Sequence, residues 1–159
     1  MITYYNGDIF TAPINILIHS CNCFHTMGSG IAKDIKLKYQ RAYEVDCMTV
    51  KGSRAKLGQF SVAMSNKDQP FHILNCYTQH RSGRDKVYVE YDKFHECMEN
   101  VNMWVKKMNV KIITPVIGCP YKISSVNAGG DWDGKILPIL EYVFGKDNTD
   151  VELLICKKE

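Results

Sequence analysis

Polar and glycine residues follow an apolar stretch near the start of the chain. Residues 14–21 form a nearly continuous apolar run that carries His19 close to its end, and Asn22 comes directly after it. Gly28-Ser29-Gly30 then opens an expected helix. Glycines let the backbone approach an anion, and the unpaired N–H groups of a helix start can bind it. This pattern predicts an anion site with an imidazole nearby that could act as an acid or base.

Both features also have an ordinary structural explanation. A lone Gly-x-Gly before a helix is typical of a tight turn, and the sequence contains neither Gly-Lys-Ser/Thr nor Gly-x-Gly-x-x-Gly at this point. His19 could equally be a core imidazole that is hydrogen-bonded to the backbone. Sequence alone leaves both explanations open.

A second pair of glycine segments lies in the last third of the chain. Gly118 follows the apolar run of residues 110–117, and Gly129-Gly130 precedes an expected helix that starts at Trp132. Two such loops that face each other would hold a diphosphate from both sides. Asp131 is expected to cap the helix rather than to contact a ligand.

A carboxylate also follows the first expected strand. Asp8 comes directly after the Asn6-Gly7 turn signal. Its oxygens could accept hydrogen bonds from an exocyclic amine such as that of adenine, or could cap the turn. Both roles stay open from the residues alone.

The elements that must position these residues alternate along the chain. Strands alternating with helices predict an α/β sandwich around a mixed sheet, and the length predicts a single domain over residues 1–159. Loops after strands should carry the ligand site, since ligands of open α/β sheets bind beyond the carboxyl ends of strands. Expected strands cover residues 2–5, 14–21, 60–64, 71–77, 110–117 and 151–156, and expected helices cover residues 28–39, 42–50, 91–108 and 132–144.

Composition and charge exclude several classes of protein. The chain of 159 residues is 45% hydrophobic and 23% charged, which is typical of a globular protein. No apolar run approaches the roughly 20 residues of a membrane span. A net charge of +3 is too mild to favour a nucleic-acid partner. We expect a monomer that binds a small molecule.

Cysteine usage indicates the compartment and the absence of a structural metal. The seven cysteines do not form Cys-x-x-Cys pairs, so zinc-binding spacing is absent and no metal or cofactor is expected. Several lie within apolar patterns, where reduced thiols act as small hydrophobes. Because the N-terminus lacks the pattern of a signal peptide, we expect a cytoplasmic location.

Four motifs together resemble the macrodomain family, which binds ADP-ribose. They are Gly7-Asp8-Ile9, His19-Ser20-Cys21-Asn22, Gly28-Ser29-Gly30-Ile31-Ala32 and Ile117-Gly118-Cys119. The resemblance covers most of the chain, and residues 16–23 are most similar to the yeast-type ADP-ribose 1″-phosphate phosphatases. It implies a macrodomain-like three-layer α/β/α sandwich with a mixed central sheet.

The resemblance also implies a role for individual residues. Asp8 would hold the adenine amino group, with the Ile9 amide beside it. Asn22 would face the distal ribose, and His19 would assist at the departing phosphate, so these two are the catalytic candidates. The other implied ligand-binding residues are Ser20, Cys21, Met27, Gly28, Ser29, Gly30, Ile31, Ala32, Thr78, Ile117, Gly118, Cys119, Pro120 and Tyr121.

The chain departs from the family pattern at two places. The usual Gly-x-Gly-Leu loop reads Gly118-Cys119-Pro120-Tyr121, and Pro120 has no amide to donate. One deADP-ribosylating branch of the family has a lysine where this chain has Gln79. A covalent route through a lysine is therefore not expected at that position.

The resemblance implies hydrolysis of ADP-ribose 1″-phosphate to ADP-ribose and phosphate. Two alternatives stay open: a reader that binds ADP-ribose without chemistry, and a hydrolase that removes ADP-ribose from protein or nucleic acid. The pairing of His19 with Asn22 favours the phosphatase over the reader.

Overall fold

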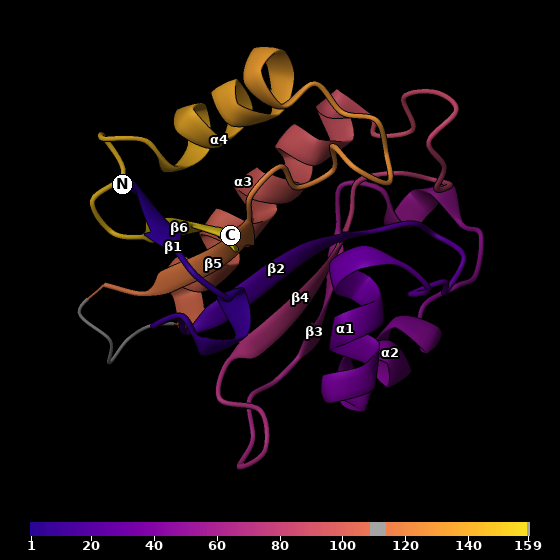
Figure 1. Cartoon of the computed structure of the whole chain (residues 1–159), viewed down its shortest axis with the longest axis horizontal. Helices are drawn as coiled ribbons and strands as arrows, with labels where there is room; N and C mark the ends of the chain where they lie inside the picture. The colour runs from indigo at the N-terminus through magenta and orange to yellow at the C-terminus, as the bar shows by residue number, and fades with distance from the viewer. Residues whose placement is uncertain (109–113, 159) are drawn as a thin grey trace.

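A mixed sheet forms the centre of the molecule (Figure 1). This computed structural model describes residues 1–108 and 114–158. Within them the sheet has the strand order β1-β6-β5-β2-β4-β3. Only β3 at one edge runs antiparallel to its neighbour β4. The strands are β1 (Ile2–Asn6), β2 (Ile16–Cys21), β3 (Phe60–Ala63), β4 (His72–Tyr77), β5 (Val116–Pro120) and β6 (Glu152–Lys157).

Helices cover both faces of the sheet, which confirms the expected three-layer sandwich. The helices α3 and α4 lie on one side, and α1 and α2 lie on the other (Figure 1). None of the described helices is long and apolar enough to cross a membrane. The helical segments are η1 (Ile9–Thr11), α1 (Gly30–Lys38), α2 (Gln40–Cys47), η2 (Arg54–Lys56), α3 (Tyr91–Met108), the π-helical turn η3 (Trp132–Ile136) and α4 (Leu137–Phe144).

Strand β2 divides the apolar core into two layers. Ile16 and Ile18 pack into the cluster that contains the buried residues of α3 and α4. Leu17 packs into the other cluster, with Ile35 of α1 and Ala42 of α2. This alternation follows from the strand, since successive side chains point to opposite faces. The same rule places His19 on the α1–α2 side and Ser20 on the α3–α4 side.

The predicted strand over residues 110–117 ends too early. Its first residues lie outside the described part of the chain, and β5 continues through Gly118 to Pro120. Gly118 is a close-packing residue, because a Cβ there would lie 2.8 Å and 3.0 Å from side-chain carbons of Ile14. Residues 118–120 therefore belong to the sheet, and the loop begins at Tyr121.

The predicted helix over residues 132–144 is two segments. A π-helical turn covers Trp132–Ile136, and α4 begins at Leu137. Pro138 lies in the first turn of α4, where its missing N–H breaks no helical hydrogen bond. The predicted helix over residues 42–50 begins at Gln40 and ends at Cys47.

Candidate ligand-binding site

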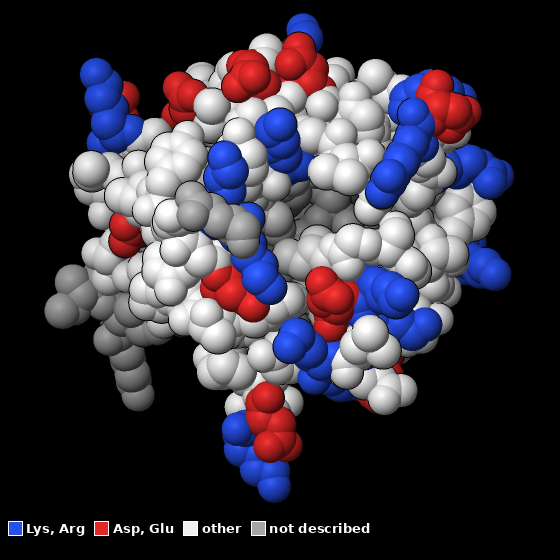
Figure 2. All heavy atoms as spheres, viewed as in Figure 1, with Lys and Arg blue, Asp and Glu red and all other residues white. Residues whose placement is uncertain are grey.

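A cavity of about 270 Å³ lies at the carboxyl edge of the parallel strands. Figure 2 shows the surface hollowed near the centre of one face, with Lys and Arg side chains around the hollow. Three segments form the wall: residues 20–32 from the end of β2 onward, residues 79–84 after β4 and residues 120–128 from the end of β5 onward. The lining residues are Ser20, Cys21, Asn22, Thr26, Gly28, Ser29, Gly30, Ile31, Ala32, Gln79, Ser82, Arg84, Pro120, Tyr121, Lys122, Ile123, Ser124, Val126, Asn127 and Ala128.

The start of α1 forms one wall and is suited to an anion. Ser29 is the N-cap, and its side chain makes no capping hydrogen bond. The first turn contains no acidic residue. Because Ser29 to Ala32 line the cavity, the unpaired N–H groups and the positive end of the helix dipole face the space where a ligand would lie.

Gly30 is needed for this arrangement. Its φ of +59° lies in the left-handed region, which side chains disfavour. A Cβ on Gly30 would also lie 3.1 Å from Asn127 Nδ2 across the cavity. Gly28 differs, since a Cβ there would meet nothing within 4 Å.

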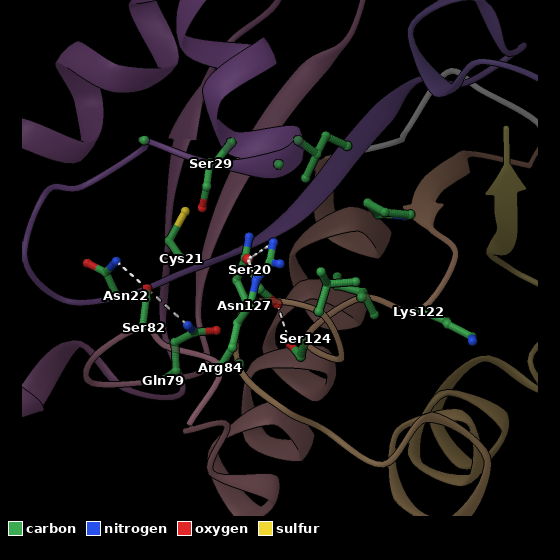
Figure 3. Close-up of a pocket in the computed structure, with 18 of the residues that line it drawn as sticks. Ser20, Cys21, Asn22, Ser29, Gln79, Ser82, Arg84, Lys122, Ser124 and Asn127 are labelled. Carbon is green, nitrogen blue, oxygen red and sulfur yellow. Dashed lines mark hydrogen bonds between the residues drawn. The ribbon is translucent and has the colours of Figure 1, made fainter. Parts of the chain in front are cut away.

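Segment 120–128 forms the facing wall (Figure 3). Its Lys122 and Ser124 have φ of +59° and +62°, a conformation that costs non-glycine residues about 1–3 kcal/mol and that clusters at functional sites. The Ser124 hydroxyl is hydrogen-bonded to the Ser20 hydroxyl and lies 3.4 Å from Thr78 Oγ1. Lys122 and Arg84 are the cationic side chains among the lining residues.

Asn22 lines the cavity, and its amide is fully engaged. Nδ2 donates to Thr26 Oγ1 at 2.5 Å and to Ser82 Oγ at 2.7 Å, and Oδ1 accepts from Phe24 N at 2.8 Å. Asn22 therefore lies at the cavity, and in this structure its side chain joins residues 22–26 to Ser82 and shapes the wall.

The expectation that His19 touches the reacting phosphate does not hold in this geometry. Its side chain is fully buried on the α1–α2 side of β2 and is not among the lining residues. His19 Nε2 lies 2.7 Å from Asn75 Oδ1, and since that oxygen can only accept, Nε2 carries the proton. Cys21 Sγ lies 3.6 Å from Nε2 and 3.7 Å from Nδ1, and Cys21, unlike His19, is a lining residue. Burial lowers the pKa of His19 to about 4, so the ring is neutral at pH 7.

The His19 imidazole belongs to a buried network that ties three strands to α2. Asn75 Nδ2 donates to Ala42 O at 3.0 Å and to Ser61 Oγ at 3.1 Å. Ser61 Oγ lies 2.8 Å from the Tyr77 hydroxyl, which donates to Asp46 Oδ1 at 2.6 Å. Burial, together with the bond to Asp46, raises the pKa of Tyr77. Because these buried polar groups are paired, the network stabilises this side of the fold.

Asp8 and Asp131 both cap helical turns. Asp8 Oδ1 accepts from Phe10 N at 2.9 Å, and Oδ2 lies 3.6 Å from Lys158 Nζ. Asp8 follows β1 and so shares the carboxyl edge with the cavity, although it does not line it. Asp131 accepts from Gly134 N at 3.0 Å, which confirms the capping role.

Several implied ligand-binding residues are instead core residues. Met27 and Thr78 are buried and do not line the cavity. Ile117, Gly118 and Cys119 lie inside β5 for the reason given above. The Ile9 side chain also packs in the α1–α2 cluster, whereas the contact implied for Ile9 is that of its backbone amide. These residues shape the site from behind its wall.

The sequence analysis missed the polar part of the wall. Gln79 was named only for the lysine it replaces; its Nε2 donates to Arg81 O at 3.2 Å and to Ser82 Oγ at 3.3 Å. Position in the sequence could have indicated most of these residues, since segments 79–84 and 120–128 lie where strands end at the ligand-binding edge. The other missed residues are Thr26, Ser82, Arg84, Lys122, Ile123, Ser124, Val126, Asn127 and Ala128.

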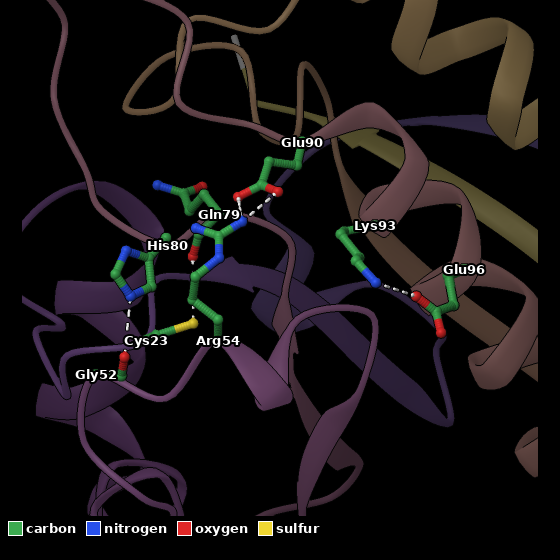
Figure 4. A network of polar contacts seen from close by, with 8 residues as sticks. All are labelled: Cys23, Gly52, Arg54, Gln79, His80, Glu90, Lys93 and Glu96. Atoms are coloured by element: carbon green, nitrogen blue, oxygen red, sulfur yellow. Dashed lines mark hydrogen bonds and ion pairs between the residues drawn. The ribbon is translucent and has the colours of Figure 1, made fainter.

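Polar contacts hold the segment after β4 in place (Figure 4). His80 Nε2 donates to Gly52 O at 2.9 Å, and Cys23 Sγ donates to Gln79 O at 3.7 Å. Arg54 Nη2 donates to both carboxylate oxygens of Glu90, at 2.8 Å and 3.0 Å. The cavity wall is therefore fixed at both ends of residues 79–90.

Comparison with known proteins agrees with this architecture. Residues 18–134 match the Macro domain family. An uncharacterized 17.5 kDa protein from the tk-vs intergenic region of enterobacteria phage T4 is 31% identical over 98% of this chain and 95% of its own. A DNA ADP-ribosyl glycohydrolase of Mycobacterium tuberculosis is 37% identical over 50% of this chain and 23% of that enzyme. An ADP-ribose 1″-phosphate phosphatase of Aspergillus oryzae is 52% identical over 24% and 20%.

Solved structures share the fold over nearly the whole chain. The macrodomain of Thermus aquaticus DarG is 19% identical with a TM-score of 0.77, covering 99% of this chain and 98% of that one. Thermosipho africanus DarTG in complex with ADP-ribose is 18% identical with a TM-score of 0.76, covering 97% and 41%. With the family match over residues 18–134, these likenesses settle the classification: the chain belongs to the macrodomain family.

Proposed function

We propose that the chain binds ADP-ribose, with the diphosphate between the start of α1 and segment 120–128. The observation that carries this proposal is the first turn of α1, which has no side-chain cap and lines the cavity. Helix N–H groups are complementary to phosphate oxygens.

A cavity of this size would hold only part of ADP-ribose. About 270 Å³ is at the low end of small-molecule sites, which measure roughly 300–1,000 Å³. The diphosphate and distal ribose would occupy the cavity, and the adenosine would extend along the carboxyl edge of the sheet toward Asp8. On this route Asp8 Oδ2, which lies 3.6 Å from the exposed Lys158 ammonium, would accept a hydrogen bond from the adenine amino group.

The reaction proposed is hydrolysis of ADP-ribose 1″-phosphate. Water adds to phosphorus, and the bond from phosphorus to the 1″ oxygen breaks. That oxygen leaves on ADP-ribose and takes up a proton, while the phosphate leaves as the inorganic ion. Phosphoryl transfer needs mainly positioning and charge stabilisation, which amides and cations of the wall would supply. Similarity over a quarter of the chain to an enzyme named for this reaction supports the proposal.

Two measurements on the purified chain test the proposed function. Phosphate release from ADP-ribose 1″-phosphate should be observed, and calorimetric titration with ADP-ribose should show binding at one site. Binding without release would make the chain a reader. Absence of both would refute the proposal.

A second candidate is removal of ADP-ribose from DNA. It is favoured by the 37% identity over half of the chain to a DNA ADP-ribosyl glycohydrolase. Gln79 argues against a lysine-based version of it. Release of ADP-ribose from an ADP-ribosylated oligonucleotide, without phosphate release in the first assay, would select this candidate.

A further inference from the structure

Arg84 brings a positive charge into the cavity, where its hydrogen-bond partner is neutral. Nε and Nη2 lie 3.4 Å and 3.3 Å from Asn127 Oδ1, which is longer than the usual 2.7–3.2 Å of such bonds. None of the ion pairs found in the described part of the chain involves Arg84. A guanidinium stays charged at any pH of interest, so its charge is uncompensated at close range.

The neighbouring charged side chains have partners elsewhere. Arg81 lies over the Phe24 ring, 4.6 Å from its centroid. Asp85 accepts from the Tyr88 hydroxyl at 2.8 Å. Glu90 is paired with Arg54. Asp85, next to Arg84 in sequence, and Glu90, six residues further on, therefore already have their own partners.

Asn127 occupies the position that an anionic oxygen would take. Its backbone oxygen accepts from Gly83 N at 3.0 Å, which fixes the residue next to Arg84. Its side chain lies between the guanidinium and Gly30 at the start of α1. In Figure 3 the Arg84 and Asn127 side chains meet beside Ser20. The Asn127 side chain thus turns its acceptor oxygen Oδ1 toward the guanidinium and its Nδ2 group toward Gly30, and a phosphate oxygen could replace the neutral acceptor beside Arg84.

We propose that Arg84 selects ligands that carry a terminal phosphate, by exchanging the Asn127 amide oxygen for two oxygens of a phosphate monoester. This inference rests on the proposed function. The planar guanidinium can bind two phosphate oxygens at once, and a monoester carries about −1.5 to −2 charges at pH 7. ADP-ribose lacks that group and would gain less from Arg84.

The test compares affinities for ADP-ribose 1″-phosphate and ADP-ribose in matched variants. Affinity for ADP-ribose 1″-phosphate would be measured by rapid mixing, before the ester is hydrolysed. R84Q should weaken binding of the phosphorylated ligand about 10- to 100-fold, the range for charge-assisted hydrogen bonds. The affinity of R84Q for ADP-ribose should fall no more than a few-fold. The affinity of R84K for the phosphorylated ligand should lie between those of the wild type and R84Q, because lysine keeps the charge and loses the planar group that binds two oxygens at once.

R81Q is the control, since it removes the same charge from the same segment outside the cavity wall. It should leave the ratio of the two affinities unchanged. An unchanged ratio in R84Q, or an equal loss in R81Q, would overturn the assignment.

A probe without the nucleoside separates this inference from the proposed function. Inorganic phosphate should shift the NMR signal of the Arg84 side-chain N–H in the wild-type chain. If ADP-ribose fails to bind but this shift occurs, the proposed function is wrong and the phosphate site stands. If ADP-ribose binds and Arg84 responds neither to phosphate nor in the affinity ratio, only the role of Arg84 is wrong.

Discussion

The end of strand β2 presents two neighbouring residues to two different environments. His19 points into a buried network with Asn75 and has a pKa lowered to about 4 by burial. Ser20 points into the cavity, where it meets Ser124 from a segment 104 residues away. The residue with the more reactive side chain is thus the one that a ligand cannot reach.

This contrast shows that the place of a side chain on β2, more than its chemical type, decides whether a ligand can reach it. Successive side chains on a strand face opposite sides. Around His19, the α1–α2 side is closed by Ala42 and by the pairing of buried polar groups, whereas the carboxyl end of β2 opens between the start of α1 and segment 120–128. Residues at this open end should therefore respond to substitutions through binding, and those of the His19 network through stability.

The largest effect is expected at Gly30. Gly30→Val should reduce ADP-ribose binding more than 100-fold, roughly, because the side chain would push into Asn127 and the phosphate position while the φ of +59° strains the backbone. Calorimetric titration measures the loss.

Gly52→Val is the matched control for backbone strain. Gly52 has a φ of +78°, and a Cβ there would lie 3.1 Å from a ring carbon of Phe24, outside the cavity. Both variants should lose about 1–3 kcal/mol of stability, and only Gly30→Val should lose binding. Similar affinities in the two folded variants would show that the loop is not the phosphate cradle.

An intermediate effect is expected at Asp8, where the open edge continues beyond the cavity. Asp8→Ala should weaken ADP-ribose binding by about 1–3 kcal/mol, since a hydrogen bond between a carboxylate and the adenine amine is lost. The inosine counterpart of ADP-ribose lacks that amine, so its affinity should not depend on Asp8. Equal affinity of the wild-type chain for both ligands would contradict the adenine assignment.

A smaller effect on rate is expected at Ser124, with no loss of stability. Ser124→Gly removes the hydroxyl that meets Ser20, and glycine adopts the φ of +62° without strain. Phosphate release should fall about 3- to 10-fold, in line with one neutral hydrogen bond, while the urea midpoint stays level or rises. Ser125→Gly, next in sequence and outside the cavity wall, is the control. A rate equal to wild type would exclude Ser124 from the reaction.

His19→Gln should leave phosphate release unchanged and alter only stability. The folded pKa of about 4 lies below the ordinary 6.5, so between these values the unfolded chain binds a proton that the folded chain does not. Stability should therefore fall as pH decreases from about 6.5 to 4, by about 3 kcal/mol from this group.

Urea unfolding of wild type and His19→Gln across that pH range checks this expectation. The variant should lose this part of the pH dependence, since glutamine does not titrate. If phosphate release by His19→Gln were about 10²–10⁴-fold slower, the cost of losing an acid–base group, the imidazole would take part in the reaction and this expectation would be wrong.

The sequence supports the order of elements and the location of the site more firmly than its details. Apolar runs and helical spacing predict the sandwich and place the ligand loops after strands. They do not show that Gly118 packs against Ile14. Glycine is required both where a backbone packs closely against a side chain and where it approaches a phosphate, so the sequence cannot distinguish the two cases. Nor do these patterns reveal Arg84, whose place in the cavity depends on contacts between segments far apart in the sequence.

The most direct test of the account is an NMR titration of the isotope-labelled chain with ADP-ribose. We predict that the largest amide shifts occur in residues 28–32 and 120–128, with a side-chain shift at Arg84, and that the His19 ring signals stay in place. Large shifts at His19 with small shifts at both loops would contradict the claim that the ligand binds at the open carboxyl end of β2.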